Sequence, residues 1–175
     1  MKKIIAVLTV LCLILSMAAL AEETSVFAFR NGVLFGMTQK DVIATEGDAR
    51  YEVDTENTKG PVTFTEVEYE NVDIEGAKAD VTYMFVEDAL VAIRVDYDDK
   101  AMSYDEIDKT LTTAFGDGAN LDVKVLGNGV YAVDDDGTPE AKAKAWVSGD
   151  IMIIAERDGD DTDVTYLDMT AAYLK

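Results

Sequence analysis

The sequence contains no histidine, and its single cysteine, Cys12, lies in the apolar N-terminal stretch. Histidine is the side chain most often used as a general base near neutral pH, and it is also the commonest metal ligand. A lone cysteine can neither close an internal disulfide nor supply a thiolate cluster for zinc. We therefore expect no enzymatic centre built on histidine or cysteine, and a fold that is stabilised by burial alone.

Basic residues are also scarce, since 15 lysines and arginines stand against 35 aspartates and glutamates, for a net charge of −20. Such a surface repels phosphate backbones and anionic lipid heads, which excludes nucleic acid as a partner. Three explanations of the charge remain open: a cationic partner, a divalent cation, or solubility alone. The hydrophobic fraction of 49% argues against disorder.

The first residues have the pattern of an export signal. Lys2 and Lys3 precede an apolar run over residues 4–15, and Ala19-Leu20-Ala21 stands just before Glu22. A basic start, a short apolar run and a small-residue cleavage site predict a secretory signal peptide over residues 1–21. The run is too short to span a bilayer comfortably, because a spanning helix needs about 20 residues.

Cys12 does not fit a lipid-attachment site, because Val10 and Leu11 precede it in place of small residues. We therefore expect no stable membrane anchor after cleavage and a secreted or periplasmic location. The mature chain, residues 22–175, would keep 13 of the 15 basic residues and all 35 acidic ones, giving a net charge of −22. We expect it to form one domain.

Two segments have the pattern of a short, capped helix. Thr38 stands three residues before Asp41, and Ser103 stands three residues before Glu106, as in a capping box. Gly47 follows the first segment and is expected to close its helix in the left-handed conformation. The second segment carries an apolar stripe at helical spacing. The residues of that stripe are Tyr104, Ile107, Leu111 and Phe115.

Alternating apolar and polar residues predict the strands. The expected strands cover residues 62–69, 81–85, 91–97, 123–126, 130–133, 141–147, 151–155 and 164–167, and residues 71–78 are expected to be a turn-rich link. The clearest pattern is the hairpin formed by 81–85 and 91–97. A slip of one residue there would turn its apolar face into water, so we expect a firm register.

The order of helix, strands, helix, strands predicts an α+β fold, with short helices packed on one face of an antiparallel sheet. The two helix signals are similar in pattern, and each precedes several strands. This similarity suggests two tandem helix-plus-strands half-repeats, over residues 33–98 and 99–170.

Gly36-Met37-Thr38, followed by Val42 and Gly47, resembles the G-M-T-x-x-x-V-x-x-x-x-G signature of the small lipoproteins of the outer-membrane barrel-assembly machinery. It is also similar to the repeats of the β-lactamase inhibitory proteins. The resemblance implies a helix packed on an antiparallel sheet and a binding scaffold in place of an enzyme. The chain departs from both groups, because Cys12 lacks a lipobox and the mature chain has no cysteine for the disulfides of the inhibitors.

We therefore expect an exported, acidic, non-catalytic binding module, inhibitor-like or envelope-associated, that recognises a protein or envelope component through its sheet face. The residues expected to mark that face are Met84, Arg94, Lys142, Lys144 and Trp146. Tryptophan and arginine are common interface anchors. The alternative is that the tryptophan belongs to the core and that the lysines balance neighbouring acids.

A second hypothesis is a calcium-dependent surface or envelope protein, because two acidic stretches could supply oxygen ligands. The candidate ligands are Asp134, Asp136, Asp158, Asp160 and Asp163. An EF-hand loop is not among the options, because the twelfth position from Asp158 is Met169 where that loop needs glutamate. A third hypothesis is a hydrolase that uses two carboxylates. We expect no cofactor, and calcium is the one candidate if any is bound.

Overall fold

The computed structural model describes residues 27–47, 51–57, 63–74, 76–98, 101–121, 142–158 and 161–171. The predicted signal peptide and the predicted strands at 123–126 and 130–133 lie outside these residues. Among the described helices, none has the length and apolar character needed to cross a membrane.

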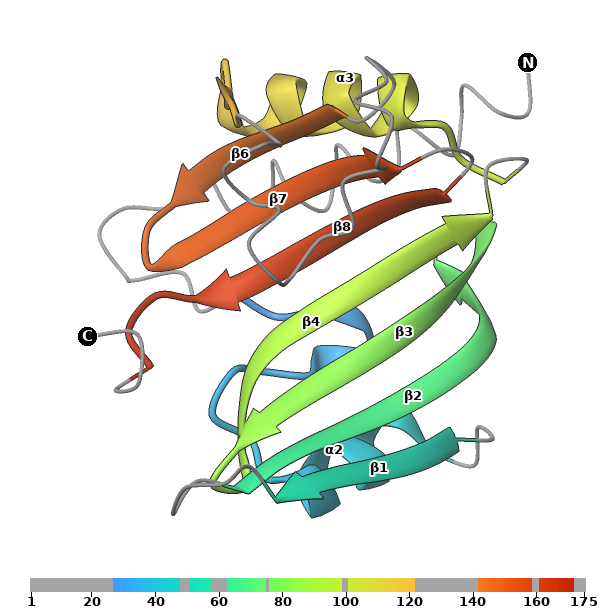
Figure 1. Cartoon of the computed structure of the whole chain (residues 1–175), viewed down its shortest axis with the longest axis vertical. Coiled ribbons are helices and arrows are strands. Elements are labelled where there is room, and N and C mark those ends of the chain that lie inside the picture. The colour runs from blue at the N-terminus through green and yellow to red at the C-terminus, as the bar shows by residue number, and fades with distance from the viewer. Residues whose placement is uncertain are drawn as a thin grey trace.

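The described residues form two α-helices, a short 3-10 helix and one eight-stranded sheet (Figure 1). The helical elements are η1 (Arg30–Gly32), α2 (Gln39–Glu46) and α3 (Tyr104–Phe115). The strands are β1 (Tyr51–Asn57), β2 (Thr63–Ile74), β3 (Ala77–Val86), β4 (Ala89–Asp98), β5 (Ala119–Asn120), β6 (Lys142–Ser148), β7 (Ile151–Asp158) and β8 (Asp161–Asp168).

The strands lie in the order β1-β2-β3-β4-β8-β7-β6-β5, and every neighbouring pair is antiparallel. The predicted α+β class with an antiparallel sheet is therefore confirmed. Helix α2 precedes β1 to β4, and α3 precedes β5 to β8. The last strand of each set, β4 or β8, lies at the middle of the sheet, where the two strands pair with each other (Figure 1).

Both predicted helix starts are confirmed. The Thr38 hydroxyl accepts a hydrogen bond from the backbone N–H of Asp41 at 3.2 Å. At α3, the Glu106 carboxylate accepts one from the backbone N–H of Ser103, also at 3.2 Å. Gly47 follows α2 with φ 81° and ψ −148°. Its φ is positive as expected, but the prediction of a left-handed helical conformation is wrong, because its ψ is extended.

The hairpin of β3 and β4 has the predicted register. Val81 lies opposite Val95, and Tyr83 lies opposite Ile93. All four side chains are buried. The pairing buries the apolar face of the hairpin, so the alternating pattern was sufficient to predict its register.

The turn-rich link expected at residues 71–78 is wrong, because β2 continues to Ile74 and β3 begins at Ala77. The pattern was misleading because the pairing of β2 with β3 shifts between Tyr69 and Val72. Asn71 adopts a positive φ of 54° within this irregularity. A bulge of this kind shifts the alternation by one position, so the second half of the strand no longer follows the first.

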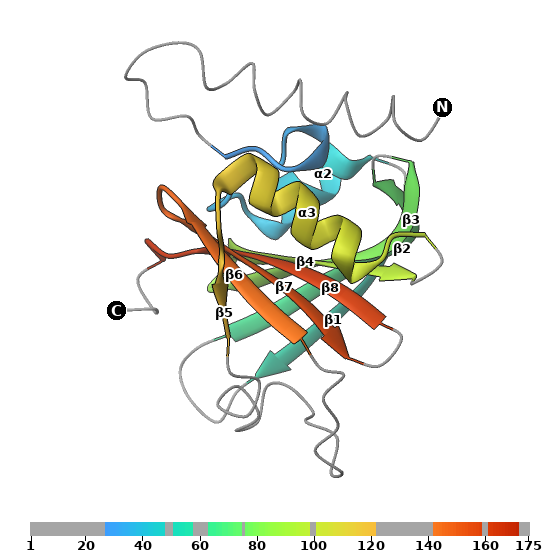
Figure 2. The same cartoon turned by 90° about the horizontal axis from the view of Figure 1, so that it is seen from above.

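Figure 2 shows α2 and α3 on the same side of the sheet. We call this side the helix face and the opposite side the far face. One continuous core cluster lies on the helix face and draws on both halves of the chain. It includes Val42 of α2, Ile107 and Leu111 of α3, and Tyr83 and Ile153 of the sheet.

Candidate interaction surface

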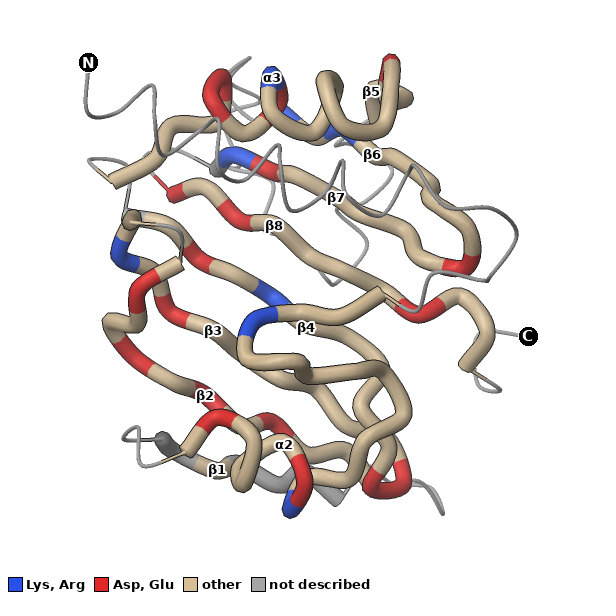
Figure 3. Tube along the Cα trace, turned by 180° about the vertical axis from the view of Figure 1, so that it is seen from behind, with Lys and Arg blue, Asp and Glu red and all other residues tan. Residues whose placement is uncertain are grey.

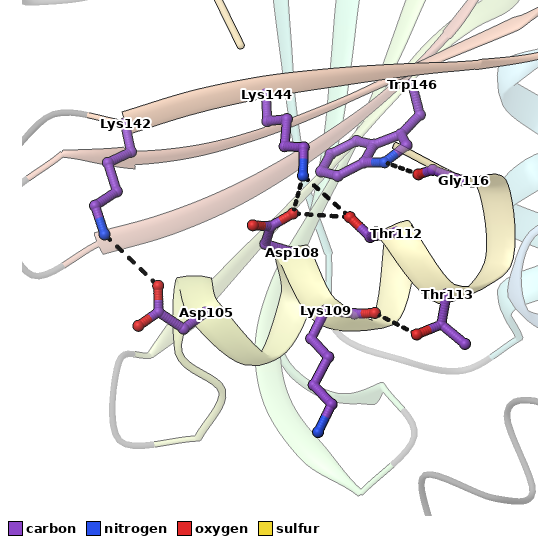
Figure 4. Close-up of polar contacts among 9 residues, drawn as sticks. All are labelled: Asp105, Asp108, Lys109, Thr112, Thr113, Gly116, Lys142, Lys144 and Trp146. Atoms are coloured by element: carbon purple, nitrogen blue, oxygen red, sulfur yellow. Dashed lines mark hydrogen bonds and ion pairs between the residues drawn. The ribbon is translucent and has the colours of Figure 1, made fainter. Parts of the chain in front are cut away.

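Trp146 lies on the helix face, beneath α3. Its side chain is only 2% exposed, and its indole Nε1 donates a hydrogen bond to the backbone carbonyl of Gly116 at 3.1 Å (Figure 4). Gly118 packs so closely that a Cβ atom built there would lie 2.6 Å from the indole ring. The tryptophan therefore joins β6 to the end of α3.

Lys144 is the next residue of β6 on the same face, and it also binds α3. Its Nζ lies 2.7 Å from Asp108 Oδ1 and 3.1 Å from Thr112 Oγ1 (Figure 4). The same ammonium group lies 5.2 Å from the centre of the Trp146 ring, within the range of a cation–π interaction. The hydrogen bond from Lys144 lowers the pKa of Asp108 below its usual value. Lys144 therefore helps to hold α3 on the sheet.

Lys142 makes a weaker version of the same contact. Its Nζ lies 3.6 Å from Asp105 Oδ1, and both side chains are exposed (Figure 4). It also lies 5.6 Å from the centre of the Tyr104 ring. An exposed ion pair of this kind contributes little to stability.

The five residues predicted to mark one sheet face lie on two faces. Trp146 lies opposite Ile153, and Ile153 and Ile93 both lie opposite Tyr166, so Trp146 shares the helix face with Ile93. Arg94 follows Ile93 in β4 and therefore lies on the far face. The expectation of one common face is wrong, because alternation within each strand does not say how separate strands align. Met84 pairs with Ala92 and lies on the far face with Arg94.

Of the proposed calcium ligands, only Asp163 has a described side chain. Asp134, Asp136 and Asp160 lie outside the described residues, and Asp158 is described only in its backbone, at the end of β7. Among the described side chains, no group of three or more histidines, cysteines, aspartates or glutamates is arranged to hold a metal ion.

The far face carries a row of apolar residues across five neighbouring strands. Each member lies directly opposite the next in the register. From β6 to β3, the row is Val147, Met152, Leu167, Ala92 and Met84. Val147 is 60% exposed, whereas Ala92 is buried in a small second apolar cluster with Val86 and Val91. At about 4.8 Å per strand, the row is about 19 Å long.

A row of four carboxylates crosses the same face four residues further along the strands. From β3 to β7, its members are Asp80, Asp96, Asp163 and Glu156, again in direct register. Burial raises the pKa of Asp96, and so does the carboxylate of Asp161, whereas Arg94 lowers it. We call these two sets the apolar row and the acidic row. Figure 3 shows acidic residues recurring along β2, β3 and β8.

The row between these two is nearly neutral. It contains Thr82, Arg94, Thr165, Ile154 and Ala145 from β3 to β6. Arg94 is exposed, and it is the only charged residue of this row. The far face therefore changes from apolar to acidic over a distance of about 13 Å along the strands.

The structure also contains a buried polar cluster that was not predicted. Glu46 of α2 has a fully buried side chain, and its carboxylate lies 3.0 Å from Arg30 Nη2. It accepts hydrogen bonds from the Tyr83 hydroxyl and from Asn31 Nδ2, the latter at 3.1 Å. Burial, and next the bond to Glu46, raise the pKa of Tyr83 well above its usual value. The burial of Glu46 could have been inferred from its spacing of four from Val42, because residues four apart lie on the same side of a helix.

Comparison of the chain with protein-family models, with curated proteins and with solved structures finds no match.

Proposed function

We propose that the chain is an exported, acidic binding module without enzymatic activity, which recognises a protein or envelope component through the far face of its sheet. The apolar row carries this proposal. A side chain such as Val147, 60% exposed at one end of that row, is available to a partner. Apolar side chains grouped on one face of a surface are typical of interaction sites.

The helix face supports the proposal from the other side. On the helix face, the large side chains of Trp146, Tyr83 and Ile153 are buried in the core and cannot contact a partner. The proposed surface keeps Met84 and Arg94 of the residues expected from the sequence. It leaves out Lys142, Lys144 and Trp146, because all three contact α3 or the segment that follows it.

The order of the strands supports a scaffold of two tandem repeats, over residues 33–98 and 99–170. Each half contributes a helix and four strands, and the two sets run in opposite orders across the sheet. We propose that the halves arose by duplication and form a scaffold like that of the β-lactamase inhibitory proteins. The N-terminal segment, with its export pattern, would deliver this scaffold to the periplasm or the cell exterior.

The test is retention of partners on the immobilised mature chain, with extracellular and envelope fractions of the producing cell applied to it. Val147→Glu and Val53→Glu are a matched pair, because both valines are exposed and occur in strands. Val53 pairs with Val67 of the core, which places it on the helix face. We expect Val147→Glu to abolish retention of specific partners and Val53→Glu to preserve it. Equal retention by both variants would refute the proposed surface.

A further inference from the structure

The segment before α2 folds back on itself and docks on the helix face. Residues 27–37, which we call the N-terminal clasp, contain η1 and a bridge between Ala28 and Leu34. The backbone N–H of Gly36 donates a hydrogen bond to the carbonyl of Leu90 at 2.8 Å, which joins the clasp to β4. Figure 2 shows this segment, in blue, on the same side of the sheet as α2 and α3. The clasp is therefore a small structure of its own that rests on the sheet.

Two phenylalanines hold the clasp where the two halves of the chain meet. The ring centre of Phe29 lies 6.1 Å from that of Tyr83 on β3 and 5.6 Å from that of Tyr166 on β8. The ring of Phe27 stacks on Tyr166 with centres 5.4 Å apart. Aromatic pairs at these separations attract one another. A short segment held by a few side chains nevertheless opens locally at a lower free-energy cost than the strands beneath it.

The tip of the clasp carries an asparagine that is followed by a glycine. Asn31 has a positive φ of 55°, which asparagine tolerates better than most residues, and Gly32 has a φ of 87°. Both residues are exposed, so water reaches them. Asparagine is a chemically labile residue, and a following glycine has no Cβ atom to hinder its nitrogen. Asn71 has a similar φ of 54°, but the β-branched Val72 follows it. The clasp therefore presents the dipeptide in which deamidation is least hindered.

We propose that Asn31-Gly32 is a deamidation site, which the docked clasp holds unreactive and which reacts when the clasp opens. In this reaction the backbone nitrogen of Gly32 attacks the side-chain Cγ of Asn31. The N–Cγ bond forms, the Cγ–Nδ2 bond breaks, and the Gly32 amide proton leaves with Nδ2 as ammonia. Water then opens the cyclic imide at one carbonyl or the other and leaves aspartate or isoaspartate. Water is the only other reactant, and the site lies on the helix face, away from the surface proposed above.

Three features of the docked clasp oppose the reaction. The N–H of Gly32 donates a hydrogen bond to the carbonyl of Phe29 at 3.1 Å, which retains the proton that must leave. Asn31 Nδ2 donates to Glu46 Oε2, also at 3.1 Å, which holds the side chain against α2. Ring closure requires the Gly32 nitrogen to eclipse Cβ of Asn31 about the Cα–C bond. At a ψ of 7° it eclipses the backbone nitrogen of Asn31 instead. The clasp must therefore leave Glu46 and unwind before the ring can close.

The product does not fit the docked arrangement. The Glu46 side chain is fully buried, and its carboxylate already pairs with Arg30 Nη2 at 3.0 Å. A second carboxylate at position 31 would replace the Nδ2 donor with an anion at hydrogen-bond distance from Glu46, and like charges this close repel each other. Isoaspartate would also add a carbon atom to the main chain within the three-residue turn of η1. Deamidation therefore converts a reversible opening of the clasp into a permanent one.

The first test compares deamidation rates by peptide mapping of the mature chain at mildly alkaline pH. We expect Asn31 to react at least about tenfold more slowly in the folded chain than in urea. Phe29→Ala removes the contacts with Tyr83 and Tyr166 and should speed the reaction at Asn31 by about tenfold. The matched control is Phe64→Ala, because Phe64 is also partly buried but packs against the small apolar cluster of the far face. It should change the rate at Asn31 by less than about twofold.

The second test concerns the product and keeps every aromatic ring. Asn31→Asp introduces the carboxylate, whereas Asn31→Gly removes the hydrogen bond to Glu46 without adding a charge and tolerates the positive φ. Hydrogen exchange of the Gly36 amide, which bonds to Leu90 in the docked clasp, reports the opening. The exchange should be about tenfold faster in Asn31→Asp than in Asn31→Gly.

Equal rates of deamidation at Asn31 in the folded and the urea-unfolded chain would overturn the inference. Equal acceleration by Phe29→Ala and Phe64→Ala would overturn it too, because global unfolding would then supply the reactive state. If Phe29→Ala does not fold, the comparison with urea and the two Asn31 variants still decide. Equal exchange of the Gly36 amide in those two variants would show that the product docks normally, which contradicts a permanent opening.

Discussion

Asp96 on β4 lies directly opposite Asp163 on β8, so two carboxylates share one cross-strand position at the centre of the sheet. Asp80 lies opposite Asp96 from the other side. The two middle strands, each the last of its half of the chain, thus meet through a pair of like charges on the far face. Cross-strand pairs of like charge destabilise a sheet.

The first prediction concerns the stability cost of Asp96, whose pKa is raised first by burial and next by the carboxylate of Asp161. Because the folded-state pKa of Asp96 is raised, stability falls as the pH rises from the unfolded-state value of 3.8 through the folded-state value. Asp96→Asn should therefore raise the free energy of unfolding at pH 7 by roughly 0.5 kcal/mol. The gain should disappear below pH 3.8. Urea unfolding at both pH values measures it, and exposed Asp117→Asn, which should gain less, is the control.

The second prediction separates packing from binding at Trp146. Trp146→Phe keeps an aromatic ring but loses the hydrogen bond to Gly116, and it should cost about 1 kcal/mol of stability. Trp146→Ala should cost about 3–5 kcal/mol, because the side chain is almost fully buried. Denaturant unfolding gives both values. Retention of the partner by folded Trp146→Phe should match that of the wild type, and a specific loss of binding without loss of stability would assign the ring to the interface.

The third prediction concerns the contact of Lys144 with Asp108. Hydrogen bonding lowers the folded-state pKa of Asp108, so its contribution is present above the unfolded-state value of 3.8 and is lost as the pH falls through the folded-state value. A double-mutant cycle with Lys144→Met and Asp108→Asn should give a coupling of roughly 0.5–1 kcal/mol at pH 7, since both groups are partly exposed. The coupling should vanish at low pH. A coupling that is independent of pH would contradict the ion pair.

The fourth prediction concerns the buried cluster under α2. Glu46→Gln leaves the Arg30 charge without its anionic partner and should destabilise the chain by about 2–3 kcal/mol. This value is below the roughly 3–5 kcal/mol typical of a fully buried pair, because the Arg30 side chain is 23% exposed and water can reach it. Adding Arg30→Met to Glu46→Gln should recover part of the loss. Urea unfolding of both variants measures this, and an additive second loss would show that the two side chains do not act as a pair.

The sequence was informative wherever a local pattern determined the structure. Thr38 and Ser103 mark the starts of the two helices, and the alternation around Tyr83 and Ile93 determines the register of the hairpin, because these signals depend only on nearby residues. The strand β1 and the second half of β2 were missed. The second half of β2 was missed because the bulge near Asn71 interrupts the alternation, and no local sequence pattern predicts that bulge.

The candidate surface was harder to predict because it depends on how distant strands align. Trp146 and Arg94 each occur in an alternating strand, but which side of the sheet each one faces follows from pairings across β6, β7, β8 and β4. The acidic row likewise draws one residue from each of four strands. The alternation within single strands therefore indicated Met84 and Arg94 as candidates. It could not predict which residues of other strands lie beside them on the far face.

The most direct test of the account is site-specific photo-crosslinking in the cells that produce the protein. A benzophenone amino acid placed at Arg94, on the far face, is compared with one at Lys109, on the exposed side of α3. The account predicts protein adducts from position 94 and none above background from position 109. Adducts from position 109 alone, or equal yields at both positions, would contradict it.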